Sequence, residues 1–212
     1  MEMDHGLDIA GLDRDRSDSQ PETGLASLDA LVKTAPATVA RGQILTGADF
    51  ARQGLPGERL DTVFEELAQT FAALPAVISD GRVWTYQELD SRANQFARLL
   101  VKRGVRPGHR VGLILDRSAE TYVALLAVMK AGAAFVPLAT AFPEERMALI
   151  IEDAGVSLIV TIAAYASRAG QLPVPHLLID SAAAEISKQS DAPLKPQAKT
   201  ASADDTCYIL YT

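Results

Sequence analysis

The sequence predicts an α/β fold with a parallel β-sheet. Short apolar runs alternate along the chain with helical patterns of about 10 to 15 residues, an order typical of βαβ units. Residues that start or stop helices separate these segments, with Ser118 and Pro143 before two helical patterns and Gly132 and Gly155 after them. In such a fold helices cover both faces of the sheet, and a ligand is expected beyond the carboxyl ends of the strands.

Composition excludes several other classes of protein. With 48% hydrophobic residues and only 14 Gly and 11 Pro among 212 residues, the chain is neither collagen-like nor wholly disordered. The single cysteine, Cys207, excludes an internal disulfide framework and a zinc site of paired cysteines. The amino terminus lacks a secretory signal pattern, and no apolar run approaches the roughly 18 residues that span a bilayer. We therefore expect a cytoplasmic protein without membrane partners.

Residues 1–57 are predicted to be a disordered leader or linker. The net charge of the chain is −7, and residues 1–22 carry −5 of it, so the remainder is close to neutral and lacks the basic footprint of a nucleic-acid-binding protein. Apolar residues recur at helical spacing over residues 25–35, which predicts a short amphipathic helix there. Packing of this helix on the rest of the chain is favoured over docking to a partner. Organised structure is expected over residues 58–212.

The organised region is predicted to begin with a helix, a hairpin and a second helix. An apolar stripe over residues 60–71 predicts the first helix, which Pro75 is expected to end. The dipeptide Asp80-Gly81 tolerates positive φ angles, so the β-rich runs on either side are predicted to form a hairpin. Thr85 and Glu88 are spaced as a capping box at the start of the second helix.

The rest of the chain supplies the sheet and its covering helices. Ser118 is expected to cap the helix AETYVALLAVMKAG, and Pro143 to occupy the first position of the following helix. The buried face of that following helix is predicted to be Met147, Ile150, Ile151 and Ala154. The strand candidates are RVGLIL, AAFVPL, LIVT, HLLI and CYILY.

No self-sufficient catalytic motif is present in the sequence. It contains no GxGxxG, GxxxxGK[ST], HExxH or GxSxG pattern. His5, His109 and His176 are far apart and have no visible partner, so a structural or solvated role is favoured for each. Cys207 lies in an apolar strand pattern, which favours an inert buried thiol over a nucleophile. We therefore expect no catalytic and no metal-binding residue in these 212 residues.

Three segments resemble core motifs of one enzyme family. They are WTYQEL (Trp84 to Leu89), MKAGAAFVPL (Met129 to Leu138) and CYILYT (Cys207 to Thr212). They resemble the first motif, the second motif and the opening of the third motif of the amino-acid adenylation domains of nonribosomal peptide synthetases, within the superfamily of adenylate-forming enzymes. The resemblance covers roughly three quarters of the chain. It implies that residues 58–212 are the amino-terminal part of the large subdomain of an AMP-binding adenylation domain, truncated at Thr212.

This resemblance implies a function and one binding residue. Enzymes of the family use ATP and Mg²⁺ to convert an amino acid to its adenylate and pass it to the phosphopantetheine group of a carrier protein. In the family the third motif continues as a phosphate loop rich in Thr, Ser and Gly, so Thr212 is the first residue of the expected ATP phosphate loop. Lys130 is interpreted as a complement to the helix dipole rather than as a phosphate ligand. The amino-acid pocket and the catalytic lysine are expected further along, and the fragment alone is expected to be inactive.

The sequence departs from the family pattern at one place, and it leaves two alternative functions open. Ala139 and Thr140 stand where the family usually has Asp and Pro. An acyl- or aryl-CoA ligase would use free coenzyme A as the acceptor, and a non-catalytic interaction module would bind a partner synthetase or a separate second half of the domain. Whichever holds, an interrupted sheet exposes an open edge and apolar helix faces, so the chain is expected to be poorly soluble or partly molten.

Overall fold

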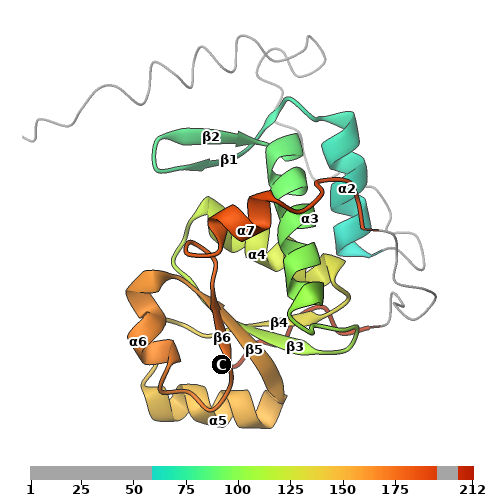
Figure 1. Cartoon of the computed structure of the whole chain (residues 1–212). Helices are drawn as coiled ribbons and strands as arrows, with labels where there is room; N and C mark the ends of the chain where they lie inside the picture. The colour runs from blue at the N-terminus through green and yellow to red at the C-terminus, as the bar shows by residue number, and fades with distance from the viewer. Residues whose placement is uncertain (1–58, 195–204) are drawn as a thin grey trace, which may run out of the picture. The chain divides into compact units, whose positions relative to one another are not determined.

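The computed structural model describes residues 59–194 and 205–212 (Figure 1). The predicted leader over residues 1–57, its helix near residues 25–35 and His5 lie outside the described residues. The elements in chain order are α2 (Leu60–Thr70), β1 (Pro75–Ser79), β2 (Arg82–Thr85), α3 (Tyr86–Lys102), β3 (Arg110–Ile114), α4 (Ala119–Lys130), β4 (Ala134–Pro137), α5 (Glu144–Ala154), β5 (Val156–Thr161), η1 (Ala163–Tyr165), α6 (Ala166–Ala169), β6 (His176–Leu178) and α7 (Ala183–Ser187). This order confirms the predicted α/β class.

The main sheet has four strands in the order β4-β3-β5-β6, and every neighbouring pair is parallel. The carboxyl ends of all four strands therefore lie along one edge of the sheet, which we call the carboxyl edge. After β4 the chain crosses β3 and continues on its other side as β5. The point between the ends of β3 and β5 is thus the topological switch point, where ligands of open α/β sheets commonly bind.

Side chains that alternate along the strands build a hydrophobic core on each face of the sheet. Val111 and Leu113 of β3 join α3, α4 and α7 in one core, whereas Ile114 joins α5 in the other. Figure 1 shows α3 and α4 on one side of the sheet and α5 on the opposite side. Burial on both faces explains why the strand segments are apolar runs rather than alternating patterns.

The hairpin is formed as predicted, with one change at its start. β1 and β2 pair antiparallel, and Asp80 and Gly81 between them have φ angles of 53° and 72°. Such angles fit the tight turns that match the twist of a hairpin. Pro75 is the first residue of β1 and does not end α2, because α2 already ends at Thr70, where the amide of Phe71 still donates to the carbonyl of Leu67.

The three predicted helix starts differ in how their first backbone amides are hydrogen-bonded. At α3 the capping box is complete, since the Glu88 amide donates to Thr85 Oγ1 at 3.2 Å and the Thr85 amide donates to Glu88 Oε2 at 2.8 Å. Ser118 occupies the N-cap position of α4 but makes no side-chain cap hydrogen bond. The hydroxyl of Thr121 instead donates to the carbonyl of Asp116 in the preceding loop. Pro143 is the N-cap of α5, one residue before the position that we predicted.

Helix α5 confirms its predicted buried face and its stop. The buried residues are Met147, Ile150, Ile151 and Ala154. Gly155 follows the helix with a φ angle of 61°, and a Cβ atom at this position would lie 2.7 Å from Arg110 Nη2. Arg110 Nε donates to the carbonyl of Ala154 at 2.8 Å, so the left-handed residue and the arginine together fix the passage from α5 into β5.

Large apolar side chains remain exposed on the described surface. Leu149 is 66% exposed and Leu60 and Leu210 are each 60% exposed, while Tyr122 and Tyr208 are half exposed. None of the helices in the described ranges is long and apolar enough to cross a membrane. Exposed apolar surface of this kind favours association with other chains in water.

The capping box gives the first prediction. Replacing Thr85 with Ala removes one side-chain acceptor from the start of α3 and should lower the free energy of unfolding by about 1 kcal/mol. Ser118→Ala is the matched control, and it should change the free energy by only a few tenths of a kcal/mol because Ser118 makes no cap hydrogen bond. Urea denaturation of both variants tests the difference, and an equal loss in both would contradict it.

The same box predicts a dependence on pH. The amide of Thr85 lowers the pKa of Glu88, so the contribution of Glu88 is present above the ordinary glutamate pKa and disappears as the pH falls through the lowered value. Glu88→Gln should lack this loss of stability on acidification. Denaturation midpoints between neutral and acidic pH provide the measurement, and parallel curves for the two proteins would count against the assignment.

The exposed leucines give a prediction about association. The 212-residue chain should self-associate at micromolar concentration, and the double variant Leu149→Lys/Leu210→Lys should be more monomeric in sedimentation velocity. Ser167→Lys adds charge at an exposed position without removing apolar surface and should have little effect. A monodisperse wild-type monomer with a sharp melting transition would show that the exposed residues do not drive association.

Candidate functional site

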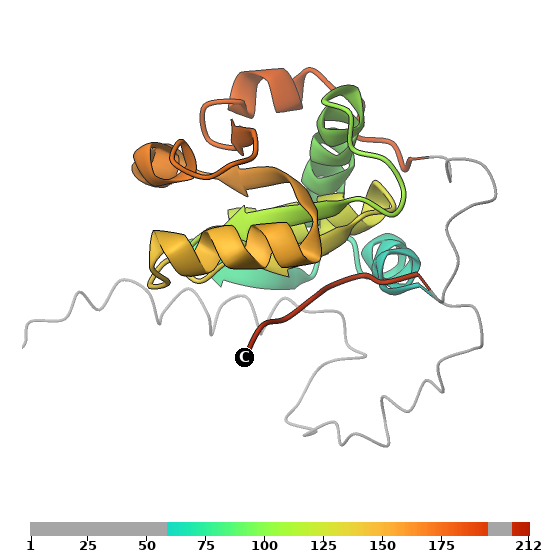
Figure 2. The same ribbon diagram turned by 90° about the horizontal axis from the view of Figure 1, so that it is seen from below.

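Residues 207–212, which we call the terminal segment, extend the main sheet beside β4. Phe135 and Tyr208 form a parallel bridge. The Phe135 amide donates to the carbonyl of Cys207 and the Ile209 amide donates to the carbonyl of Phe135, both at 3.0 Å. Because the segment runs parallel to β4, it leads towards the carboxyl edge (Figure 2). The predicted strand CYILY is therefore present as one bridge rather than as a full ladder.

Side chains of the terminal segment are inserted on both sides of this bridge. Ile209 and Tyr211 pack against the core on the α5 side of the sheet, and the hydroxyl of Tyr211 donates to Asp153 of α5. This hydrogen bond to a carboxylate raises the pKa of Tyr211. On the other side, the ring of Tyr208 stacks on Phe135 with centroids 5.7 Å apart. The segment is thus held by packing on two faces as well as by backbone hydrogen bonds.

Thr212 lies at the exposed end of the terminal segment. The parallel direction of the segment aims this residue at the edge where ligands of parallel sheets bind. Its predicted role as the first residue of a phosphate loop remains a prediction. Cys207, at the other end, packs against a small core of Ala93, Leu126 and Met129, but it is only partly buried rather than buried as the sequence predicts.

Two residues that the sequence analysis did not single out span the switch point. Asp116 follows β3 and Tyr165 follows β5, and the Tyr165 hydroxyl lies 2.8 and 2.7 Å from the two carboxylate oxygens of Asp116. This hydrogen bond raises the pKa of Tyr165. Asp116 could have been found from the sequence because it directly follows a predicted strand, whereas no local pattern indicates Tyr165.

The loop after β4 is fixed in a similar way. The amide of Phe142 donates to the carbonyl of Ala139 at 2.9 Å, which closes a tight turn. Arg168 of α6 donates to the carbonyls of Thr140 and Phe142. Ala139 itself is exposed. The turn closes through backbone hydrogen bonding, so it does not need an aspartate side chain at this position.

The groups at the carboxyl edge serve mainly to hold its loops. The carboxylate of Asp116 is bound by Tyr165, and Asp180 accepts from the Ala163 amide at 2.8 Å. Within residues 59–194 and 205–212, no three His, Cys, Asp or Glu side chains are arranged to hold a metal ion. What this edge offers to a ligand is therefore a rigid frame and the terminal segment that leads to it.

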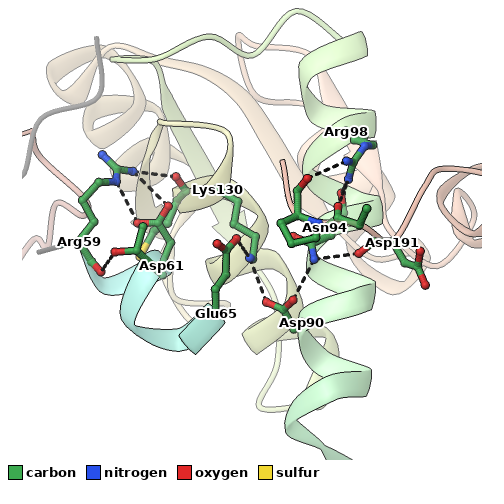
Figure 3. Close-up of polar contacts among 12 residues, drawn as sticks. Arg59, Asp61, Glu65, Asp90, Asn94, Arg98, Lys130 and Asp191 are labelled. Atoms are coloured by element: carbon green, nitrogen blue, oxygen red, sulfur yellow. Dashed lines mark hydrogen bonds and ion pairs between the residues drawn. The ribbon is translucent and has the colours of Figure 1, made fainter. Parts of the chain in front are cut away.

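Lys130 differs from the sequence-based interpretation. It is the last residue of α4, as expected, but its side chain is only 1% exposed and lies between Glu65 of α2 and Asp90 of α3 (Figure 3). A buried ion pair, rather than a helix dipole at the surface, accounts for this lysine. Because α4 leads into the amino end of β4, Lys130 lies at the edge opposite to the carboxyl edge, which also excludes direct contact with a phosphate bound there.

The structure brings two of the three histidines to one pocket. His109 and His176 line a hollow of about 300 Å³ together with Arg103 and Ser157. His109 precedes β3 and His176 begins β6, so the hollow lies at the amino ends of the strands. The two histidines therefore lie at the edge opposite to the carboxyl edge, and they contribute no group to the edge towards which the terminal segment runs.

Comparisons with known proteins agree on one family. Residues 64–212 match the family model described as AMP-binding enzyme. Surfactin synthase subunit 2 of Bacillus subtilis (strain 168) is 39% identical over 171 residues, which are 80% of this chain and 5% of that subunit.

Solved structures give the same result. The nonribosomal peptide synthetase FmoA3 in its α-methyl-L-serine-AMP-bound form is similar with a TM-score of 0.67 and 31% identity, over 76% of this chain and 18% of that one. NpsA-ThdA, an artificially fused adenylation-PCP di-domain from Klebsiella oxytoca, is similar with a TM-score of 0.65 and 25% identity, over 74% of this chain and 29% of that one. The chain thus spans less than a third of each of these three proteins.

The loop contacts at the carboxyl edge give a prediction about tyrosine ionisation. Asp116→Asn should lower the pKa of Tyr165 towards its ordinary value, because the hydroxyl no longer donates to a carboxylate. Asp153→Asn is the matched control and should lower the pKa of Tyr211 without affecting Tyr165. Titration of the ring carbons by NMR resolves the two tyrosines. An unchanged Tyr165 pKa in the Asp116 variant would disprove the contact at the switch point.

Proposed function

This chain belongs to the family of AMP-binding enzymes, and from that premise we propose that it carries the first part of an enzyme that activates an amino acid with ATP for nonribosomal peptide synthesis. The geometry of the terminal segment carries the proposal. A segment that ends in Thr212 is paired beside β4 and leads to the carboxyl edge of a parallel sheet, where a phosphate loop is expected to lie.

The named relatives support the amino acid as the substrate. FmoA3 is a nonribosomal peptide synthetase by name, and it binds α-methyl-L-serine-AMP in the structure that resembles this chain. We propose the corresponding reaction here, in which the carboxylate of an amino acid attacks the α-phosphate of ATP and pyrophosphate leaves. Positioning of the two reactants and neutralisation of charge at the phosphates supply the rate enhancement of such a reaction.

The described residues fit one part of an ATP site. Thr212 is exposed at the end of the terminal segment, and hydroxyl and backbone amide groups such as those it carries bind phosphate oxygens well. The carboxylates nearest the switch point are less suited to Mg²⁺, because Asp116 is bound by Tyr165 and Asp180 by a backbone amide. We therefore assign the start of the phosphate loop to this chain and the ligands of Mg²⁺ to residues beyond those described.

We further propose a carrier protein as the acceptor of the activated amino acid. In the artificial NpsA-ThdA fusion an adenylation domain is joined to a PCP domain, and its structure is similar to that of this chain. Transfer to the phosphopantetheine thiol of such a carrier would complete the activation, in the cytoplasm. An acyl- or aryl-CoA ligase would pass the acyl group to free coenzyme A instead.

A chimera tests the proposed function. The 212 residues are joined after Thr212 to the remainder of the matching adenylation domain of surfactin synthase subunit 2, and amino-acid-dependent exchange of pyrophosphate into ATP is measured. We expect exchange by the chimera and none by the 212-residue chain alone. Thr212→Val should reduce the exchange by about tenfold or more, since a hydrogen bond to a charged phosphate is lost, whereas Thr212→Ser should retain most of it.

The control is the threonine just before the terminal segment. Thr206→Val alters an equally exposed residue that lies six positions from Thr212, and it should leave the exchange unchanged. A folded chimera that activates no amino acid, or one that consumes free coenzyme A with a carboxylic acid, would refute the proposed substrate and acceptor.

A further inference from the structure

Three helices meet at one buried ammonium group. Nζ of Lys130 on α4 forms ion pairs with Glu65 of α2 and with Asp90 of α3, and its distance to Asp90 Oδ1 is 3.0 Å (Figure 3). The side chains of Glu65 and Asp90 are themselves 22% and 15% exposed. We call these three residues the ion cluster.

The charges in the ion cluster do not balance. Two carboxylates face one ammonium, and Asp90 Oδ1 has the ion pair but no hydrogen-bond donor among the described residues. Asp90 Oδ2 accepts from Asn94 Nδ2 at 2.9 Å, which satisfies the second oxygen. Loss of Lys130 would leave two partly buried carboxylates without a counter-charge, so Lys130 adds a charged link to the apolar packing of α2 and α3 against α4.

The ion cluster borders the surface on which the terminal segment rests. Met129, next to Lys130, packs with Leu126 of α4 and Ala93 of α3 in the small core that Cys207 contacts. The carbonyl of Met129 also accepts from Arg59 Nη2 at 3.1 Å, which ties the end of α4 to the start of α2.

The same end of α4 also determines the position of β4. Only three residues separate Lys130 from Ala134, the first residue of β4. The next residue, Phe135, makes both backbone hydrogen bonds to the terminal segment. A shift at the end of α4 would therefore move both the core under Cys207 and the strand that pairs with the segment.

We propose that Lys130 is a positioning residue, which holds α4 and β4 in the arrangement that docks the terminal segment and presents Thr212. The assignment of Thr212 to a phosphate loop rests on the proposed function, but the docking of the segment does not. The two carboxylates contribute unequally. Asp90 links α4 to α3, the two helices whose buried residues form the core that Cys207 packs against, whereas Glu65 links α4 to α2, which adds only the partly buried Phe64 to that core.

Two residues that occur once in the sequence make the docking measurable in the full 212-residue chain. Cys207 is the single cysteine and is partly buried while the terminal segment is docked, so displacement of the segment should raise its rate of modification by a thiol reagent above the rate of the docked state. Trp84 in β2 is the single tryptophan, so its fluorescence reports separately on unfolding of the chain. A positioning role predicts faster modification of Cys207 while the Trp84 signal remains native.

The carboxylate variants provide a matched pair. Asp90→Asn and Glu65→Gln each leave one carboxylate opposite Lys130, so both are expected to fold. We expect Asp90→Asn to accelerate modification of Cys207 by about fivefold and Glu65→Gln by less than about twofold. Lys130→Met should accelerate it by about tenfold or more. Lys102→Met, which removes an exposed lysine from the end of α3, should leave the rate unchanged.

Several results for these variants would overturn the positioning role of Lys130. Wild-type rates in both Asp90→Asn and Lys130→Met would overturn the proposal, as would equal acceleration by the two carboxylate variants. If Lys130→Met fails to fold, the ratio of the Cys207 modification rates in Asp90→Asn and Glu65→Gln tests the proposal instead. Acceleration that follows the Trp84 unfolding signal in every variant would show a purely structural role and would also overturn it. Because no ATP is present, failure of the proposed function would leave these rates unaffected.

Discussion

The backbone of Phe135 is the contact on which the placement of the candidate site depends. Its amide and carbonyl pair with Cys207 and Ile209, and this one bridge sets the direction of the terminal segment. Two backbone hydrogen bonds contribute only about 1 to 3 kcal/mol net, which is too little to fix a segment on its own. Packing of Ile209 and Tyr211 on one side and stacking of Tyr208 on the other supply the rest. Together they aim Thr212 at the carboxyl edge.

β4 can offer this contact because helices fix it from both faces. The core around α5 covers one face, and α3 and α4 cover the other, with charged groups inside the second helical layer. Burial of apolar surface provides most of the stability of such a fold but is not directional. The ion pairs of Lys130 instead require two particular side chains beside one buried ammonium group, and a buried charge is costly without such partners. Hydrophobic packing thus holds the layers together, while the ion cluster fixes the position of the last residues of α4.

Local signals in the sequence were sufficient for most of the fold. The capping box at Thr85, the Asp80-Gly81 turn and the buried face of α5 are confirmed because each depends on neighbours a few residues away. The resemblance to adenylation domains is confirmed as well. Long-range contacts were not predictable: Lys130 and Glu65 are 65 positions apart, and Tyr165 and Asp116 are 49 apart. Ser118 shows the limit of propensity, since it occupies a cap position without making the cap hydrogen bond. The leader over residues 1–57 and the role of Thr212 stay predictions.

The central claim is that an ordered sheet presents the terminal segment to the carboxyl edge. Amide hydrogen exchange in the 212-residue chain tests it most directly at Ile209, whose amide donates to the carbonyl of Phe135. If the segment is docked, the Ile209 amide should exchange at least about tenfold more slowly than in a short peptide of residues 205–212. The Phe135 amide should be protected with it. Exchange of Ile209 at the peptide rate, with β3 and β5 still protected, would show that the segment is not docked and would contradict the account.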